Sequence, residues 1–245
     1  PISVLLLVIV TVCISVLTRL IPEPAGARLE ASGPSERRDR GGLLNGIVLL
    51  ARSPYLAGIC VYLFLYTLSS TVLYFEQAHI VKESISDAGD RTSFFAWIDF
   101  SVNSLTFVTQ LLLTGRILTL FGVGTGLALL PALTLGGFAW LSAAPSLTVL
   151  AVFQVLRRSM NYAVARPARE VLYTVVGREE KYKAKSFIDT FVYRAGDQIG
   201  AWGFELLTVF GLGLSAIALT AVPMAGLWIV VGLLLGHAHR SRARR

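Results

Sequence analysis

The chain carries little charge for its size. Of its 245 residues, 15% are Asp, Glu, Lys or Arg and 54% are hydrophobic, and the mean hydropathy is +0.66. A soluble domain of this length cannot bury so much apolar side chain, because many of its residues must stay near water. The scarcity of charge therefore excludes an ordinary soluble protein and indicates the lipid bilayer as a partner.

Cysteine and histidine are also scarce, which argues against two kinds of site. Cys13 and Cys60 lie inside apolar runs, as small core residues do, so we expect no disulfide. His79, His237 and His239 are too scattered for a metal cluster. The sequence also lacks the G-x-x-x-x-G-K phosphate loop and any concentrated set of catalytic groups. We therefore expect no metal, no cofactor and no enzymatic activity.

Long apolar runs dominate what is present. About 20 apolar residues in a helix cross the hydrocarbon core of a bilayer, and these runs do not alternate as the strands of a β-barrel do. The sequence predicts an all-α polytopic membrane protein. Its expected spans are about 1–20, 55–81, 92–114, 122–141, 146–166, 186–210 and 212–236.

Basic residues between the spans indicate the orientation. One side carries those of the 21–54 segment, Arg116, the 177–185 loop and the tail, while the other side carries Lys82 and Arg91. By the positive-inside rule, the 21–54 segment and the C-terminus are cytoplasmic. The net charge of +7 is thus a topology signal. Because the basic residues are split over short loops, nucleic acid is not an expected partner.

The order of spans and loops predicts part of a larger carrier. Segment 21–54 is rich in Pro, Gly, Ser and charge, which is typical of a hydrated linker. One span, a linker and six spans match the second half of a twelve-span carrier of the major facilitator architecture. We expect 1–20 to be the last helix of an N-terminal half, 55–236 the six-helix C-terminal bundle, and 237–245 a basic cytoplasmic tail. The N-terminal half would then be the partner of this bundle.

Two adjacent arginines, Arg157 and Arg158, lie in the predicted 146–166 span. Counting from Ser146 places them about 17 Å deep, near the membrane midplane. A charge at that depth costs about 2.5–3.5 kcal/mol on insertion scales, so it needs a cavity or a counter-charge. Arginine also suits bidentate binding of phosphate or carboxylate. We expect one of the pair to contact an anionic substrate, with a structural ion pair as the alternative.

The end of the same span carries Arg166, Arg169 and Glu170, which share one helix face. Pro167 removes a backbone donor and favours a kink there. A charged, kinked end is suited to a cytoplasmic gate that makes and breaks ion pairs. The alternative is a solvated helix end that only follows the positive-inside rule.

In the predicted 186–210 span, Asp189, Tyr193 and Asp197 recur every four residues on one face. Arg194 lies three residues before Asp197, so the two can pair within the helix. We assign Tyr193 and Arg194 to substrate binding. The carboxylates Asp189 and Asp197 would pair with arginines in the empty state or carry protons.

Polar residues form a stripe in the predicted 92–114 span. Asp99, Asn103, Thr106 and Gln110 follow one another at spacings of four, three and four. Such a stripe lines a cavity, in which case Asn103 contacts substrate and Asp99 serves coupling, or it supplies hydrogen bonds between helices. In the 55–81 span, Glu76 lies about 30 Å from Tyr55. It is predicted to be an interfacial carboxylate, or alternatively part of an outer gate or coupling site.

Three stretches within 166–197 resemble one family. "RPAREVLYTVV", "KYKAKSFIDT" and "YRAGD" are similar to the ATP/ADP translocases of plastids and intracellular bacteria and their relatives in free-living bacteria. The resemblance implies a major facilitator carrier in the bacterial inner membrane. Family members of known activity exchange ATP for ADP or import nucleotides with protons.

The resemblance includes one match and one departure within the 186–210 span. Lys185 and Asp189 match the family's K-x-x-I-D opening of this helix. About one turn after Tyr193 the exchangers carry a lysine, whereas this chain has Asp197. We therefore expect a secondary-active, alternating-access transporter for an anionic small molecule, such as a nucleotide or another phosphorylated compound. ATP and ADP do not follow securely as its substrates. The alternative is a non-transporting membrane scaffold or sensor that keeps the fold.

Overall fold

The computed structural model describes residues 53–244, and within them every regular element is helical. The chain is an all-α polytopic membrane protein. Its α-helices are α4 (Pro54–Ser84), α5 (Ala88–Thr109), α6 (Gly122–Ala143), α7 (Leu147–Met160), α8 (Arg166–Leu172), α9 (Arg178–Phe187), α10 (Tyr193–Val209) and α11 (Leu214–Ala243). Short π-helical turns occupy Gln110–Thr114, Ile117–Phe121, Asn161–Ala165 and Ile188–Val192, and a 3₁₀ turn occupies Tyr173–Val175. The predicted helix 1–20 and the linker up to residue 52 lie outside the described residues.

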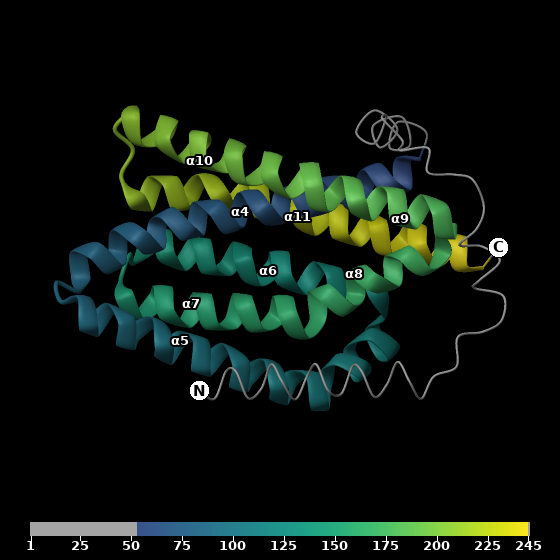
Figure 1. Ribbon diagram of the computed structural model, residues 1–245, viewed down its shortest axis with the longest axis horizontal. Coiled ribbons are helices and arrows are strands. Elements are labelled where there is room, and N and C mark those ends of the chain that lie inside the picture. The colour runs from purple at the N-terminus through teal and green to yellow at the C-terminus, as the bar shows by residue number, and fades with distance from the viewer. Residues whose placement is uncertain (1–52, 245) are drawn as a thin grey trace, which may run out of the picture. The chain divides into compact units, whose positions relative to one another are not determined.

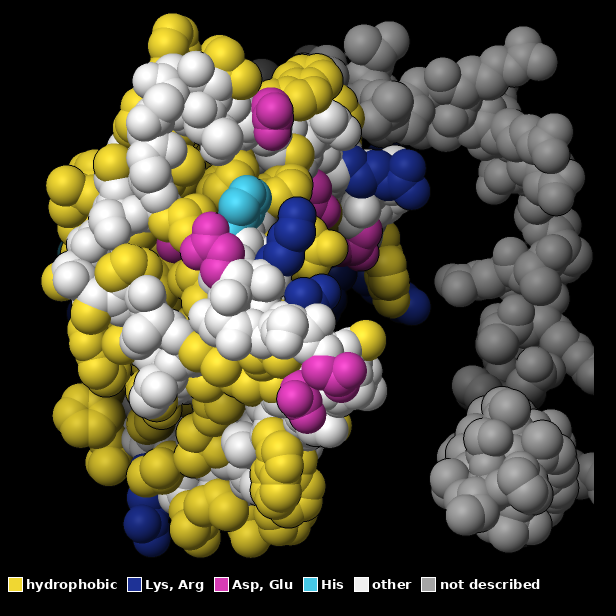
Figure 2. Space-filling view, turned by 90° about the vertical axis from the view of Figure 1, so that its left-hand side faces the viewer, with side chains coloured by type: hydrophobic (Ala, Val, Ile, Leu, Met, Phe, Trp, Pro, Cys, Tyr) yellow, Lys and Arg dark blue, Asp and Glu magenta, His cyan; other side chains and the backbone are white. Residues whose placement is uncertain are grey.

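The described helices run back and forth between two ends (Figure 1). The end that holds Pro54, Arg116, Gly177 and the C-terminal end of α11 is called the basic end. The opposite end holds the loops at 85–87, 144–146 and 210–213. Seen from the opposite end, hydrophobic and uncharged side chains cover most of the surface, and charged ones are scattered (Figure 2). The main pairs in contact are α11 with α6 and α4, α10 with α4, and α7 with α5 and α6.

Among the described residues, three helical stretches are long and apolar enough to cross a membrane. They are Pro54–Ser84, Ile117–Ala143 and Leu214–Ala243. The other long stretches, namely α5, α7 with α8, and α9 with α10, carry the charged and polar residues predicted for the site. All of these helices lie close to the six ranges predicted after residue 54. Whether each of the more polar ones crosses the bilayer stays a prediction.

Two segments predicted as loops are largely helical. The segment between the predicted spans 92–114 and 122–141 contains a π-helical turn at Ile117–Phe121, and the helix breaks at Gly122, whose φ of 80° suits a residue without a Cβ. The predicted loop 177–185 instead begins α9 at Arg178. Glu, Lys and Ala favour helix, and Glu179 and Glu180 lie at the helix start, where they complement the helix dipole. The prediction of a loop at 177–185 is therefore wrong for residues 178–185, which form a charged helix.

The apolar core consists of two clusters, one toward each end of the bundle. The cluster toward the basic end includes Leu56, Leu172 and Trp228, and the other includes Phe138 and Phe153. Burial of such side chains stabilises the fold by about 1.5–3 kcal/mol each relative to exposure. On α4 the first cluster ends near Leu68 and the second begins near Val72. Polar residues of α4 near this boundary contribute to the candidate site.

Candidate functional site

Arg157, in the last turn of α7, is a buried cation held by α4. Its side chain is 5% exposed, and its Nη2 donates to the Oγ atoms of Ser69 and Ser70, both at 2.9 Å. Each serine hydroxyl donates in turn to the Tyr66 carbonyl, at 2.9 and 2.8 Å. This leaves the serine lone pairs free to accept from the guanidinium. Within residues 53–244 no carboxylate pairs with Arg157, and its Nε has no hydrogen-bond partner.

Arg169, in α8, is buried as well, so the interpretation of this residue as part of a solvated helix end is wrong. It is 9% exposed, and its guanidinium donates to the Tyr193 hydroxyl at 3.2 Å and to Asn161 Oδ1 at 3.5 Å. A π-helical turn directly precedes α8, where Pro167 lacks the backbone N–H that a regular turn would use. A π-helical turn rotates the residues that follow it relative to a continuous α-helix. Arg169 lies against α4, over the ring of Tyr66.

Tyr66 of α4 joins the two arginines. The guanidinium carbon of Arg157 lies 5.5 Å from the centroid of its ring, and that of Arg169 lies 5.4 Å from it. Asn161 donates to its hydroxyl at 3.1 Å. Arginine does not lose its proton in proteins, so two positive charges gather on one aromatic ring. A buried charge without a counter-charge costs several kcal/mol. An anion placed between these groups would remove much of that cost.

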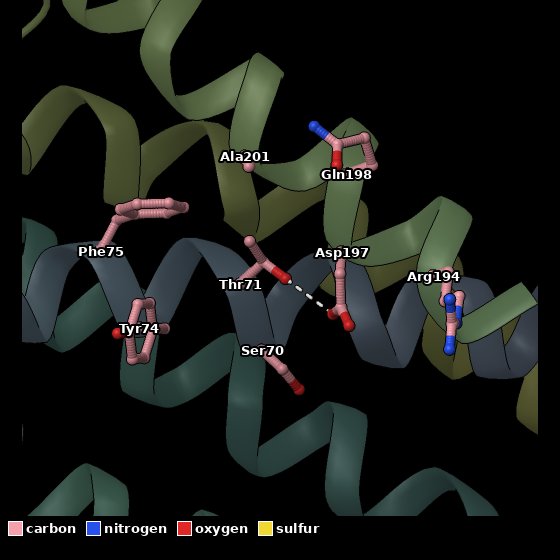
Figure 3. A pocket seen from close by; sticks show the side chains of 8 residues that line it. All are labelled: Ser70, Thr71, Tyr74, Phe75, Arg194, Asp197, Gln198 and Ala201. Atoms are coloured by element: carbon pink, nitrogen blue, oxygen red, sulfur yellow. Dashed lines mark hydrogen bonds between the residues drawn. The ribbon is translucent and has the colours of Figure 1, made fainter.

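These groups are called the arginine cluster, which comprises Tyr66, Ser69, Ser70, Arg157, Asn161 and Arg169. A groove of about 740 Å³ lies beside the arginine cluster, between α4 and α10 (Figure 3). Its lining residues are Ser70, Thr71, Tyr74, Phe75, Arg194, Asp197, Gln198 and Ala201. Ser70 both lines the groove and accepts a hydrogen bond from Arg157, so the buried arginine and the groove share a wall. The predicted residues Arg194 and Asp197 thus line the same groove as Ser70, a hydrogen-bond partner of Arg157.

The expected pair between Arg194 and Asp197 is not formed. Thr71 of α4 donates to Asp197 Oδ1 at 3.1 Å, and Figure 3 shows that carboxylate turned toward Thr71. The close approach of α4 and α10 explains the difference, because it brings the threonine hydroxyl to the carboxylate. Arg194 is exposed on the groove wall.

A second pocket, of about 370 Å³, lies toward the basic end. It brings together all three predicted gate residues, Arg166, Arg169 and Glu170, with Asp189 and Tyr193 from the next helical stretch. Lys185 of α9 also lines it and pairs with Glu170 at 2.7 Å. Arg166 lies over the ring of Tyr162, 4.5 Å from its centroid. The three gate residues therefore share a pocket but have different partners.

Arg158 differs from its neighbour Arg157. It pairs with Asp99 of α5 at 2.7 Å, and the two side chains are 37% and 57% exposed. Directly after α5, Gln110 donates to the Tyr162 carbonyl at 3.2 Å, while Asn103 of α5 is exposed. The polar stripe thus supplies bonds to the α7 stretch at two of its four positions. Arg158 already has its counter-charge.

Glu76 is buried inside the protein, whereas the sequence predicted an interfacial carboxylate, and its depth in the bilayer stays a prediction. It is 0% exposed, and neither carboxylate oxygen has a hydrogen-bond partner among the described residues. Helix α4 continues to Ser84, beyond the expected end at 81, so Glu76 lies two turns inside the helix. Its neighbours on the same face, Leu73 and Ile80, belong to the apolar core.

Sequence reasoning did not assign four residues of the arginine cluster to the site. They are Tyr66, Ser69, Ser70 and Asn161. The three on α4 follow at spacings of three and one, and Asn161 lies four residues after Arg157, on the same helix face. That spacing was the available signal, but only the packing of α4 against α7 shows that the two sets meet.

Comparison with known proteins gives one distant relative. The chain is similar to ADP,ATP carrier protein 1 of Chlamydia pneumoniae, with 22% identity over 189 residues, covering 69% of this chain and 37% of the carrier. The chain thus spans well under two thirds of that protein's length. No family model matches the chain. No solved structure matches it either.

Proposed function

We propose that this chain belongs to a secondary-active carrier that moves an anionic, phosphorylated small molecule such as a nucleotide across the membrane. One observation carries the proposal: Arg157 and Arg169 are buried on the ring of Tyr66, and no described carboxylate pairs with either of them. A membrane protein retains buried charges where they bind a substrate or pair with a group of opposite charge. Here the missing counter-ion would be the transported anion.

The chemistry of the cluster suits phosphate oxygens. Guanidinium groups bind phosphate through paired, charge-assisted hydrogen bonds, and no group among residues 53–244 accepts a hydrogen bond from the Arg157 Nε. The groove beside Arg157 has about 740 Å³, which is within the range of roughly 300–1,000 Å³ typical of small-molecule sites. Its aromatic wall, Tyr74 and Phe75, offers a surface on which a base or another flat group could stack.

Alternating access would move this site between the two sides of the membrane. In this proposal a six-helix bundle of the major facilitator type rocks against an N-terminal half. The pocket around Arg169 lies between the cluster and the basic end, taken to be cytoplasmic, and the Glu170–Lys185 pair lies in its wall. Breaking the Glu170–Lys185 ion pair would widen the path from the basic end to the arginine cluster.

The similarity to an ADP,ATP carrier supports this class of function, and Asp197 limits the choice of substrate. A carboxylate in the groove wall repels a highly charged polyphosphate unless the substrate leaves that wall free. We therefore include monophosphates and inorganic phosphate, beside ATP and ADP, among the candidate substrates.

The test is uptake by proteoliposomes that contain the full-length protein. ATP, ADP, a nucleoside monophosphate and phosphate are offered to the wild type, Arg157→Gln and Arg178→Gln. The last is the matched control, because Arg178 is exposed at the start of α9. A hydrogen bond to a charged group is worth about 1.5–3 kcal/mol. We thus expect Arg157→Gln to weaken substrate affinity about tenfold or more, since 1.4 kcal/mol is a factor of ten.

Two results would contradict the proposal. If the wild type moves none of these anions, the scaffold or sensor function is favoured. If Arg157→Gln transports like Arg178→Gln, the arginine cluster is not the binding site.

A further inference from the structure

We propose that Glu76 is a proton-binding site, and that release and uptake of its proton couple anion transport to the proton gradient. The coupling rests on the proposed function, whereas the proton site itself does not. Glu76 is completely buried on α4. It is outside the arginine cluster, and neither of its oxygens has a hydrogen-bond partner within residues 53–244.

Glu76 lies on a face of α4 that packs in the apolar core. Leu73 and Ile80 lie one turn before and one turn after it on the same face of α4. They belong to a core cluster with residues of α6 (Phe138, Leu141), α7 (Val149, Leu150, Phe153) and α11 (Ala218, Ala221). Moving a carboxylate from water into such a site without a partner costs several kcal/mol even after relaxation, while the neutral acid costs much less. The observed conformation therefore fits a protonated Glu76.

Few charged or titratable groups stand near it. Helix α6 has none along Gly122–Ala143, and α11 has none in the part that packs in this cluster. On α7 the first charged residue is Arg157. Helix α5 packs against the same cluster through Phe94 and Phe95. Its charged residues are Asp90, which is exposed, Arg91, which donates to the Ile85 carbonyl, and Asp99, which pairs with Arg158. Helix α10 contributes Asp197, which is bonded to Thr71, and Glu205, which is exposed. On α4 itself, His79 bonds to the Phe75 carbonyl, and Lys82 and Glu83 are exposed. None of these groups forms a hydrogen bond or an ion pair with Glu76 in the described part of the chain, so none of them holds it ionised.

Glu76 is also connected to the arginine cluster by the geometry of α4. Ser70, which holds Arg157, lies six residues before it, or about 9 Å along the helix axis. The next residue, Gln77, accepts a hydrogen bond from Gln154 of α7, one turn before Arg157. A movement of α4 against α7 that admits water to Glu76 would therefore also change the hydrogen bonds from Arg157 to Ser69 and Ser70.

The proton step is simple. When water reaches the carboxyl group, its O–H bond breaks, the proton passes to water, and the electron pair stays on the carboxylate, which is then hydrated. Return to the buried state takes a proton back. If this cycle accompanies each transport cycle, the imposed proton gradient drives accumulation of the anion.

Two measurements test the proposal. The first is infrared spectroscopy of the full-length protein in lipid without substrate. We expect a carbonyl band of a protonated carboxylic acid that is absent in Glu76→Gln and present in Glu83→Gln, a control at an exposed position on the same helix. The absence of such a band from the wild type, or its persistence in Glu76→Gln, overturns the proton site. Loss of the wild-type band at high pH supports it even if the variant does not fold.

The second measurement uses proteoliposomes with ATP, ADP or phosphate. Glu76→Gln resembles the neutral acid, so we expect it to keep exchange of one anion for the same anion and to lose accumulation driven by a pH gradient. Glu83→Gln should keep both activities. Gradient-driven accumulation by Glu76→Gln overturns the coupling. If the wild type moves no anion, the proposed function and the coupling fail together, whereas the infrared band still decides the proton site.

Discussion

Arg157 of α7 and Arg169 of α8 lie against the same aromatic ring, with their guanidinium carbons 5.5 and 5.4 Å from the centroid of Tyr66. The two residues are twelve positions apart along a stretch that changes from α- to π-helix and back. Two like charges are held close together although they repel. The Tyr66 ring contacts both guanidinium groups. The hydroxyls of Ser69 and Ser70 accept hydrogen bonds from Arg157, and Asn161 accepts one from Arg169. This relationship leads to the first two predictions.

Tyr66 is expected to matter for its ring more than for its hydroxyl. Replacement by Phe removes one neutral hydrogen bond, worth about 1 kcal/mol. Replacement by Ala removes two cation–π contacts, worth about 2 kcal/mol each where water is excluded. Tyr66→Ala should therefore lower thermal stability in detergent and the affinity for a transported anion far more than Tyr66→Phe does. Tyr182→Ala, at a position of α9 that is 63% exposed and lines neither pocket, is the control. Equal effects of Phe and Ala at position 66 would argue against the role of the ring.

Arg158 and Arg157 should respond differently to the same substitution. Because Arg158 already pairs with Asp99 in an exposed position, Arg158→Gln should change substrate affinity little, unlike Arg157→Gln. Exposed pairs are typically worth about 0.2–1 kcal/mol. A double-mutant cycle of Arg158→Gln and Asp99→Asn on unfolding should give a coupling energy in that range. A larger coupling, or a loss of affinity as great as at Arg157, would show that this pair belongs to the site.

Gly196 is expected to set the distance between α4 and α10. A Cβ at this position would overlap the Thr67 side chain, whereas at Gly203 of the same helix it meets nothing within 4 Å. Overpacking typically costs about 1–3 kcal/mol. Gly196→Ala should therefore lower the unfolding temperature and alter the groove between the two helices. Gly203→Ala should be neutral or slightly stabilising, since Ala favours helix. Unfolding temperatures in detergent compare the two, and equal values would contradict this packing.

Glu179 provides a prediction about pH outside the apolar helices. A hydrogen bond from Lys183, at 2.6 Å, and the charge of that lysine lower the pKa of the Glu179 carboxyl below its ordinary value of 4.5. A depressed pKa stabilises the folded state above the ordinary value, and this contribution disappears as the pH falls through the lowered pKa. NMR titration of the Glu179 carboxyl should show the lowered pKa in the wild type and Lys181→Gln, and a higher one in Lys183→Gln. An unchanged pKa in Lys183→Gln would contradict this cause.

Much of the architecture could be predicted because it depends on local patterns. Apolar runs of helical length give the helices, and Ser53, Asp87 and Ser146 cap three of them by accepting bonds from the first turns. Charge was a poorer guide to loops. The basic and acidic residues of 178–185 form a helix, since a charged segment on a polar surface can satisfy its backbone within itself.

The sequence by itself determined that this chain is a helical membrane protein with costly charges inside its helices. Hydropathy and charge are properties of single residues, so they can be evaluated without knowledge of tertiary contacts. Only the tertiary structure decided which charges are compensated. Arg157 and Arg158 are neighbours in sequence, but one is buried against serines of α4 and the other pairs with Asp99 of α5. Glu76 was predicted to be an interfacial carboxylate from its position along the helix, yet its side chain is completely buried, between Leu73 and Ile80 on a face of α4 that belongs to the apolar core. Whether a charge has a partner depends on contacts between helices distant in sequence, and helical periodicity cannot supply that information.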